Sequence, residues 1–275
     1  MRVLHENNLV RLRQCRHGVM AYHPKDSHVG RSLDLYGEWA ESELELLGVL
    51  LQPGQVAVDV GANIGTHAVF FAERVGATGT VIAFEPQRLV HQLLCANLAL
   101  NGHSHAHAVH AAVGQAPGSI VVPGIDYAQG GNFGGLALGD WKEGETVSMI
   151  TLDGFGLTRC NLIKIDVEGM ELQVLLGAQE TLRCHRPILF VENNGPNGAP
   201  EVVDLLMGMD YSLVWHFSPF YRSDNFAGNN ENVFGPLIDA NMLAVPPALA
   251  GAVSSLEPVR NASDTAERAL QRLRR

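Results

Sequence analysis

Three apolar runs of this 275-residue chain end in carboxylic side chains: Glu85, the pair Asp166 and Glu168, and Glu192. Carboxylates can accept hydrogen bonds from hydroxyl groups, neutralise a bound cation or remove a proton from a reacting group. Lys164 and Asp166 are two residues apart, so they are predicted to share one face of a strand and to form an ion pair. Because doubly wound folds bind ligands at the carboxyl edge of the sheet, we expect these acids to lie at one binding edge.

A glycine-bearing turn precedes the acids, in the segment V-D-V-G-A-N-I-G-T at residues 58–66. Glycines in such a turn let a nucleotide approach the backbone closely. The spacing lacks the G-x-G-x-x-G of dinucleotide sites, which disfavours a nicotinamide cofactor. Asn63 is the non-glycine residue type that best tolerates a left-handed backbone, so the turn can keep its shape. Glu85, at the end of the next strand, could accept hydrogen bonds from ribose hydroxyls. The pattern favours a cofactor that contains ribose.

From residue 55 onward, β-branched runs alternate with helical patterns, which is typical of a parallel sheet with crossover helices. Strands are predicted at residues 56–60, 80–84, 106–113, 162–167, 188–191, 211–216 and 241–245. Helices are predicted at residues 39–51, 66–74, 87–100, 171–183 and 201–209. We therefore predict an α/β fold with a doubly wound, mostly parallel, seven-stranded sheet.

The remaining segments complete the predicted organisation. The glycine-rich stretch at 114–144 is too long and polar for an ordinary connection, so we predict a hairpin insertion that acts as a lid. No linker divides the strands, which favours one α/β domain. We expect an N-terminal segment with a helix packed on the core at 1–54, the α/β domain at 55–246, and a helical or mobile tail at 247–275.

The composition narrows the function classes. A formal charge of −10 argues against a general binder of the nucleic-acid backbone, which needs a cationic face. No apolar run is long enough for a membrane span, and the N-terminus lacks the apolar segment of a signal peptide. The 4 cysteines are widely spaced, as expected for reduced thiols in the cytoplasm. We expect a cytoplasmic protein with no membrane or nucleic-acid partner, and the oligomeric state stays open.

Together these motifs resemble those of the FkbM family of methyltransferases. The most specific similarity is I-K-I-D-V-E-G at 163–169, and it is accompanied by similar motifs at 58–67, 84–86, 132–135, 175–178 and 187–192. The resemblance implies a Rossmann-like fold of the class I methyltransferase type. It also implies transfer of a methyl group from S-adenosylmethionine, commonly to a hydroxyl oxygen.

The resemblance also implies roles for individual residues. The expected cofactor-binding set is Asp59, Gly61, Asn63, Gly65, Thr66, Glu85, Asn132 and Asp166. Tyr36 and Glu38, ahead of the first predicted helix, could close over the cofactor or could simply start that helix. The acceptor is expected to be a hydroxyl group of a small molecule, a sugar or a natural product. The alternatives are a nicotinamide-dependent oxidoreductase and a non-catalytic module that binds S-adenosylmethionine.

Methylation of an alcohol requires a proton acceptor, because the alcohol cannot ionise by itself before the methyl group arrives. Glu168, Glu192 and His216 are the candidate bases, since each lies at or just past the end of a predicted strand. A divalent metal held by these residues and Asp166 is an alternative. We predict no metal, because the spacing fits no compact metal-binding motif.

Overall fold

The computed structural model describes residues 2–139, 141–193 and 199–274. Its central sheet has the strand order β14-β12-β13-β11-β10-β4-β5-β6. The bounds of these strands, in chain order, are β4 Val56–Val60, β5 Thr80–Phe84, β6 Ala106–Val109, β10 Leu162–Ile165, β11 Ile188–Glu192, β12 Ser212–Pro219, β13 Ile238–Val245 and β14 Glu257–Pro258.

The five strands from β11 to β6 run parallel, whereas β13 is antiparallel to β11 and β12 is antiparallel to β13. Every residue of β4 and β10 is buried, as expected for central strands that are covered on both faces. The predicted doubly wound, mostly parallel sheet is confirmed. The short strand β14 adds an eighth member to the seven predicted strands.

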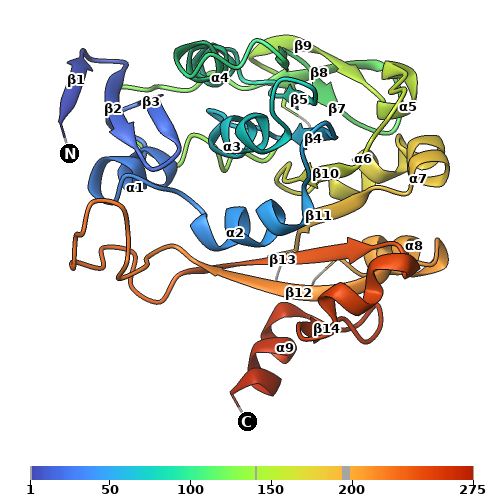
Figure 1. Ribbon diagram of the computed structural model, residues 1–275. Helices are drawn as coiled ribbons and strands as arrows, with labels where there is room; N and C mark the ends of the chain where they lie inside the picture. The colour runs from blue at the N-terminus through green and yellow to red at the C-terminus, as the bar shows by residue number, and fades with distance from the viewer. Residues whose placement is uncertain (1, 140, 194–198, 275) are drawn as a thin grey trace.

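Helices cover both faces of the sheet, and Figure 1 shows α2, α3 and α4 on one side with α6, α7 and α8 on the other. Side chains of a strand alternate between faces, so Ala57 packs with the first group of helices while Val58 and Val60 pack with the second. The helices are α1 Val29–Leu35, α2 Glu41–Leu50, α3 Thr66–Val75, α4 Arg88–Leu100, α5 Leu152–Phe155, α6 Glu171–Leu176, α7 Gln179–His185, α8 Pro200–Gly208 and α9 Ala266–Leu273.

Two predicted elements are divided in the structure. The helix expected at 171–183 is split into α6 and α7, and Gly177 lies at the break. A Cβ on Gly177 would lie 2.1 Å from the carbonyl oxygen of Gly114. The break therefore lies at a glycine, where the start of the insertion passes close to the helix. The strand expected at 106–113 ends at Val109, because the chain turns there and β7 (Ala112–Val113) joins a different sheet.

Two small sheets flank the central one. A hairpin is present as predicted, but it extends beyond the predicted bounds of 114–144: β8 (Gly118–Val122) pairs antiparallel with β9 (Glu145–Ile150), which follows the insertion, and β7 pairs with β9. The N-terminal segment forms an unpredicted three-stranded sheet of β1 (Val3–Glu6), β2 (Arg11–Cys15) and β3 (Gly18–Tyr22).

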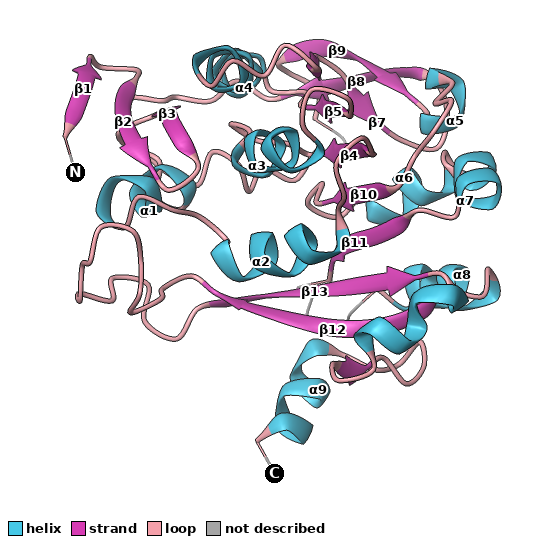
Figure 2. Cartoon of the chain, in the orientation of Figure 1, coloured by secondary structure: helices cyan, strands magenta, loops and turns pink. Residues whose placement is uncertain are grey.

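The connection between β12 and β13 is long and irregular, and it extends away from the sheet toward the N-terminal segment, near α1 (Figure 2). After β13 the chain forms the short 3-10 helix η1 (Pro247–Val253), β14 and α9. Among the described residues, no helix is both long and apolar enough to cross a membrane.

Candidate active site

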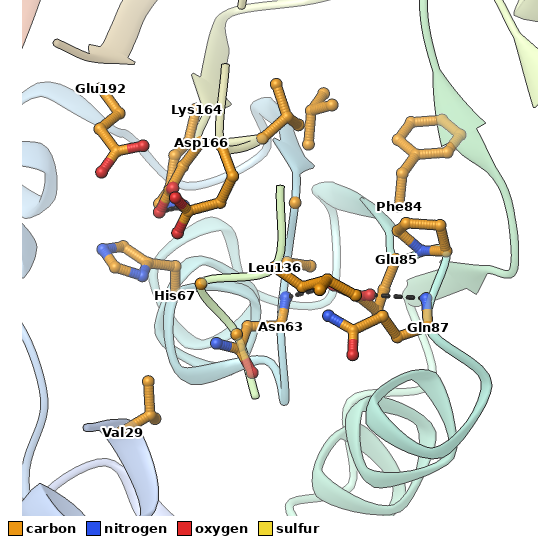
Figure 3. Close-up of a pocket in the computed structure, with 18 of the residues that line it drawn as sticks. Val29, Asn63, His67, Phe84, Glu85, Gln87, Leu136, Lys164, Asp166 and Glu192 are labelled. Carbon is orange, nitrogen blue, oxygen red and sulfur yellow. Dashed lines mark hydrogen bonds and ion pairs between the residues drawn. The ribbon is translucent and has the colours of Figure 1, made fainter. Parts of the chain in front are cut away.

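A cleft lies at the carboxyl edge of the sheet, where β4, β5, β10 and β11 end. Eight of the predicted site residues line it: Gly61, Asn63, Thr66, Glu85, Asn132, Asp166, Glu168 and Glu192. Figure 3 shows Glu85 and Gln87 toward one end of this cleft, while Lys164, Asp166 and Glu192 gather toward the other with His67 below them. The sheet therefore brings most of the predicted residues to one place.

The glycine turn between β4 and α3 forms the floor of the cleft. Gly61 has a φ of 78°, and a Cβ there would lie 1.8 Å from the carbonyl oxygen of Asp166, so no other residue fits. Asn63 has a φ of 50°, which confirms that asparagine occupies the left-handed region within this turn. Gly65 also has a positive φ, but it packs against Leu94 of α4 and does not line the cleft.

Glu85 joins this turn to the end of β5. Its carboxylate accepts hydrogen bonds from the backbone N–H of Asn63 (3.0 Å) and of Gln87 (2.8 Å). Burial raises the pKa of Glu85 to about 7 despite these two donors. Each carboxylate oxygen can accept a further hydrogen bond, and the side chain borders the cleft. The side-chain Oε1 of Gln87 is also buried, with no hydrogen-bond partner among the described residues.

At the opposite end, Lys164 holds two carboxylates together. Its Nζ lies 2.9 Å from Asp166 Oδ2 and 3.7 Å from Asp59 Oδ1, so the predicted pair of Lys164 and Asp166 is confirmed. Burial raises the pKa of Asp166, but the ammonium of Lys164 outweighs it and holds the pKa below its usual range. Asp59 is fully buried beneath the turn and does not line the cleft. It lies beside Lys164 and away from the cleft.

Asp166, Glu168 and Glu192 form the acidic cluster of this site: each offers an oxygen within 4.8 Å of the others. Burial, followed by repulsion from Asp166, raises the pKa of Glu168 to about 7 and that of Glu192 further. Glu168 has a φ of 52°, a conformation that costs a non-glycine residue about 1 to 3 kcal/mol. Strain of this kind is typical of residues held in place for function.

His67 and Glu43 form a buried pair that the sequence did not reveal. His67, in the first turn of α3, lines the cleft, and its Nε2 lies 3.1 Å from Glu43 Oε2 of α2. Asn241 of β13 donates a hydrogen bond to the other oxygen of Glu43. Burial lowers the pKa of His67 to about 4, so the imidazole is neutral near pH 7. This pair ties α2 and α3 to the sheet beneath the acidic cluster.

Besides Asp59 and Gly65, three further predicted residues lie outside the lining of the cleft. Tyr36 and Glu38 are buried between the N-terminal segment and the connection from β12 to β13, where the Tyr36 hydroxyl donates to the carbonyl of Glu231. His216 of β12 is partly buried with its ring 5.8 Å from that of Phe190, and burial lowers its pKa. Its Nε2 has no hydrogen-bond partner among the described residues.

The turn at 132–135 of the insertion lies directly against the glycine turn. A Cβ on Gly134 would be 2.0 Å from the side-chain nitrogen of Asn63, and Gln87 donates a hydrogen bond to the carbonyl of Phe133. The ring of Phe133 packs edge-on against His23 and Tyr127, at 5.0 and 4.9 Å between centroids. The predicted lid is thus anchored at this turn, beside the floor of the cleft.

Comparison with known proteins shows the family of the chain. The model of the methyltransferase FkbM domain matches residues 59–213, more than half of the chain and the segment that carries the glycine turn, Glu85 and the acidic cluster. The chain belongs to the FkbM family of S-adenosylmethionine-dependent methyltransferases. No curated protein matches its sequence.

Several solved structures have a similar arrangement at low sequence identity. Methyltransferase FkbM from Methylobacillus flagellatus is 19% identical, with a TM-score of 0.45, over 74% of this chain and 50% of that protein. This chain therefore spans half the length of that protein. Trm5b from Pyrococcus abyssi is 11% identical over 88% of this chain and 56% of that protein, with a TM-score of 0.49. An rRNA methylase from Streptococcus thermophilus is 13% identical over 74% and 95%, with a TM-score of 0.43.

Proposed function

We propose that this methyltransferase transfers the methyl group of S-adenosylmethionine to a hydroxyl oxygen of a small molecule. The observation that carries the proposal is the placement of Glu85 and the acidic cluster at opposite ends of one cleft, with the glycine turn between them (Figure 3). A carboxylate at one end can accept hydrogen bonds from ribose hydroxyls, and carboxylates at the other end can stabilise the positive charge of a sulfonium.

The residues of the cleft fit this cofactor. Glu85 keeps acceptor capacity on both oxygens, and the unpartnered Oε1 of Gln87 beside it can accept another hydrogen bond. Gly61, Asn63 and Thr66 present backbone and small side chains at the floor, where a ligand can approach closely. When bound, the cofactor supplies an electrophilic methyl group on a positively charged sulfur. Asp166, kept ionised by Lys164, would stabilise that charge.

Glu168 is the base that we propose. Its pKa of about 7 suits a group that must be ionised at neutral pH and must then accept a proton from the acceptor hydroxyl. Glu192 has a pKa raised further and lies beside Asp166, so we assign it the role of holding a proton in the free enzyme. An alcohol cannot ionise by itself before the methyl group arrives, so an oxygen acceptor requires a base of this kind.

A divalent metal bound by the acidic cluster is the second candidate, because three oxygens within 4.8 Å of one another match a hard cation. We favour the metal-free reaction, since Lys164 already neutralises part of the cluster. Turnover should persist after dialysis against EDTA. Loss of turnover that is restored by magnesium or manganese would instead show that the reaction requires a divalent metal.

The test of the proposed function is transfer of labelled methyl groups. The protein is incubated with methyl-labelled S-adenosylmethionine and an extract of the cell that produces it, and the labelled product is identified by mass spectrometry. We expect a small molecule with a new methyl ether. A labelled product with methyl on nitrogen or carbon, or label confined to RNA or protein, would contradict the proposal. Thermal stabilisation by NAD and not by S-adenosylmethionine would instead support an oxidoreductase.

A further inference from the structure

The connection from β12 to β13 forms part of one wall of the cleft. Phe220, directly after β12, and Asp239, at the start of β13, both line it. Phe220 packs edge-on against Trp39 and His28, with ring centroids 5.0 and 5.8 Å apart, and these two residues also line the cleft. An aromatic wall, defined here as His28, Trp39 and Phe220, therefore meets the acidic cluster.

Tyr36 clamps this connection onto the N-terminal segment. Its hydroxyl donates to the carbonyl of Glu231 (2.8 Å) and accepts from the N–H of Val233 (2.9 Å), while its own carbonyl accepts from Ala227 (2.9 Å). The Tyr36 ring packs against Phe234, which in turn packs against Phe220 at 5.5 Å between centroids. Tyr36 thus reaches the aromatic wall through one intervening side chain.

Glu38 makes a second clamp from the same segment. It accepts a hydrogen bond from the backbone N–H of Phe226 (2.7 Å) and pairs with Arg16 at 2.8 Å. Arg16 also donates to the carbonyl of Asp224 (3.0 Å). Tyr36 and Glu38 are 1% and 6% exposed, so these contacts, rather than a ligand, occupy their side chains.

The charges at the wall restrict what can bind there. Asp239 lies near Glu168 and Glu192 and adds to the repulsion that raises their pKa values. Among the described residues that line the cleft, Lys164 is the single lysine or arginine, and it is already paired with Asp166. An anionic acceptor would meet like charges, which costs several kcal/mol. A bound sulfonium would already place one positive charge beside the acidic cluster. The acceptor therefore needs no positive charge of its own to balance the carboxylates.

From these contacts we infer that the connection from β12 to β13, positioned by Tyr36 and Glu38, forms the acceptor-binding wall, and that this wall selects an uncharged ring with hydroxyl groups. The flat rings of the wall suit the apolar face of such an acceptor, and carboxylates accept strong hydrogen bonds from its hydroxyls. This inference rests on the proposed function and adds the charge class of the acceptor to it. Tyr36 and Glu38 act as positioning residues, without touching the cofactor.

The charge class is tested on the labelled product. After transfer from labelled S-adenosylmethionine to compounds in the cell extract, the products are passed over anion and cation exchangers near pH 7. We expect the label in the unretained, neutral fraction of small molecules. A labelled small molecule retained by either exchanger overturns the inference and leaves the proposed function standing. Label found only in RNA or protein, label absent from every fraction, or a protein that binds no S-adenosylmethionine overturns the proposed function and the inference with it, so the two failures are distinguishable.

The positioning role is tested with Tyr36→Phe, which keeps the ring and removes the hydroxyl. Loss of two hydrogen bonds should raise the KM for the recovered acceptor about three- to tenfold, with kcat and the Kd for S-adenosylmethionine unchanged. Tyr211→Phe is the matched control, because the Tyr211 hydroxyl is buried without a hydrogen-bond partner among the described residues and the residue does not line the cleft. Weaker cofactor binding with an unchanged KM for the acceptor would show that Tyr36 does not position the acceptor-binding wall. It would support the prediction from the sequence that Tyr36 contacts the cofactor.

Discussion

The ammonium of Lys164 lies 2.9 Å from the carboxylate of Asp166, at the end of the central strand β10. This contact holds the pKa of Asp166 below its usual range, and it is made by a lysine side chain that is only 4% exposed. Burial, followed by repulsion from the negative charge on Asp166, then raises the pKa values of Glu168 and Glu192, because the three carboxyl groups lie close together at one end of the cleft. Lys164 therefore fixes the charge of the one acid that repels the other two.

Replacing Lys164 by methionine should destabilise the protein strongly. Removing one partner of a buried ion pair leaves a charge without compensation, here Asp59 and Asp166, and typically costs about 3 to 5 kcal/mol. Urea denaturation near pH 7 measures the loss. Arg88→Met breaks the exposed pair with Glu145 and is the control, with an expected change below about 1 kcal/mol. Equal stability of the Lys164 variant and wild type would show that the pair contributes little.

Replacing Gly61 by alanine should also damage the fold at the floor of the cleft. The residue has a positive φ, and the new Cβ would collide with the carbonyl oxygen of Asp166 at 1.8 Å. The combined strain and overpacking should cost about 2 to 4 kcal/mol. The melting temperature of Gly102→Ala is a useful comparison, because Gly102 also has a positive φ but nothing lies within 4 Å of its Cβ position. Equal losses in both variants would rule out the predicted collision.

Glu85→Ala should weaken binding of S-adenosylmethionine at least about tenfold, or by roughly 1.5 to 3 kcal/mol, because a buried charged acceptor for the ribose is lost. Glu85→Gln keeps one acceptor oxygen and should lose less. Glu73→Ala, an exposed position on α3, controls for removal of an acidic residue. Calorimetric titration gives the three affinities, and an unchanged affinity in Glu85→Ala would remove Glu85 from the cofactor site.

Binding of S-adenosylmethionine should strengthen as the pH rises to about 7 and should level off above it. Glu168 has a pKa raised to about 7, so below that pH it is mainly protonated in the free protein. A bound sulfonium favours the ionised carboxylate, so binding releases a proton and affinity grows by up to about tenfold per pH unit below the pKa. S-adenosylhomocysteine lacks the sulfonium and should show a weaker pH dependence. The same pH dependence for both ligands, measured by calorimetry, would contradict this coupling.

The sheet could be predicted because its central strands are continuous apolar runs. Val56–Val60 and Thr80–Phe84 were predicted with the bounds that the structure has, and the acids at their edge followed from parallel topology. The N-terminal sheet could not be predicted in this way. Its strand β2 contains Arg11 and Arg13, which pair with Asp34, so charged residues interrupt the pattern that marks a strand.

Contacts between distant segments were also invisible in the sequence. Glu43 meets His67 across two helices, and Tyr36 meets Val233 almost two hundred positions later in the chain, and no local spacing encodes either contact. The strained backbone of Glu168 was equally hidden, because a glutamate in the left-handed region breaks the usual preference. Sequence patterns located the acids, whereas their charges depend on tertiary neighbours.

Turnover of Glu168→Gln tests the central claim most directly. The substitution keeps the size of the side chain and removes the base, so single-turnover methyl transfer should fall roughly 10² to 10⁴-fold. The melting temperature should change little. The affinity for S-adenosylmethionine at pH 8 should fall modestly, because the ionised carboxylate near the sulfonium is lost, so transfer is measured with saturating cofactor. Glu180→Gln, at an exposed position of α7 away from the cleft, is the matched control and should keep near wild-type turnover. If Glu168→Gln transfers methyl groups at the wild-type rate, Glu168 is not the base and the proposed mechanism is wrong.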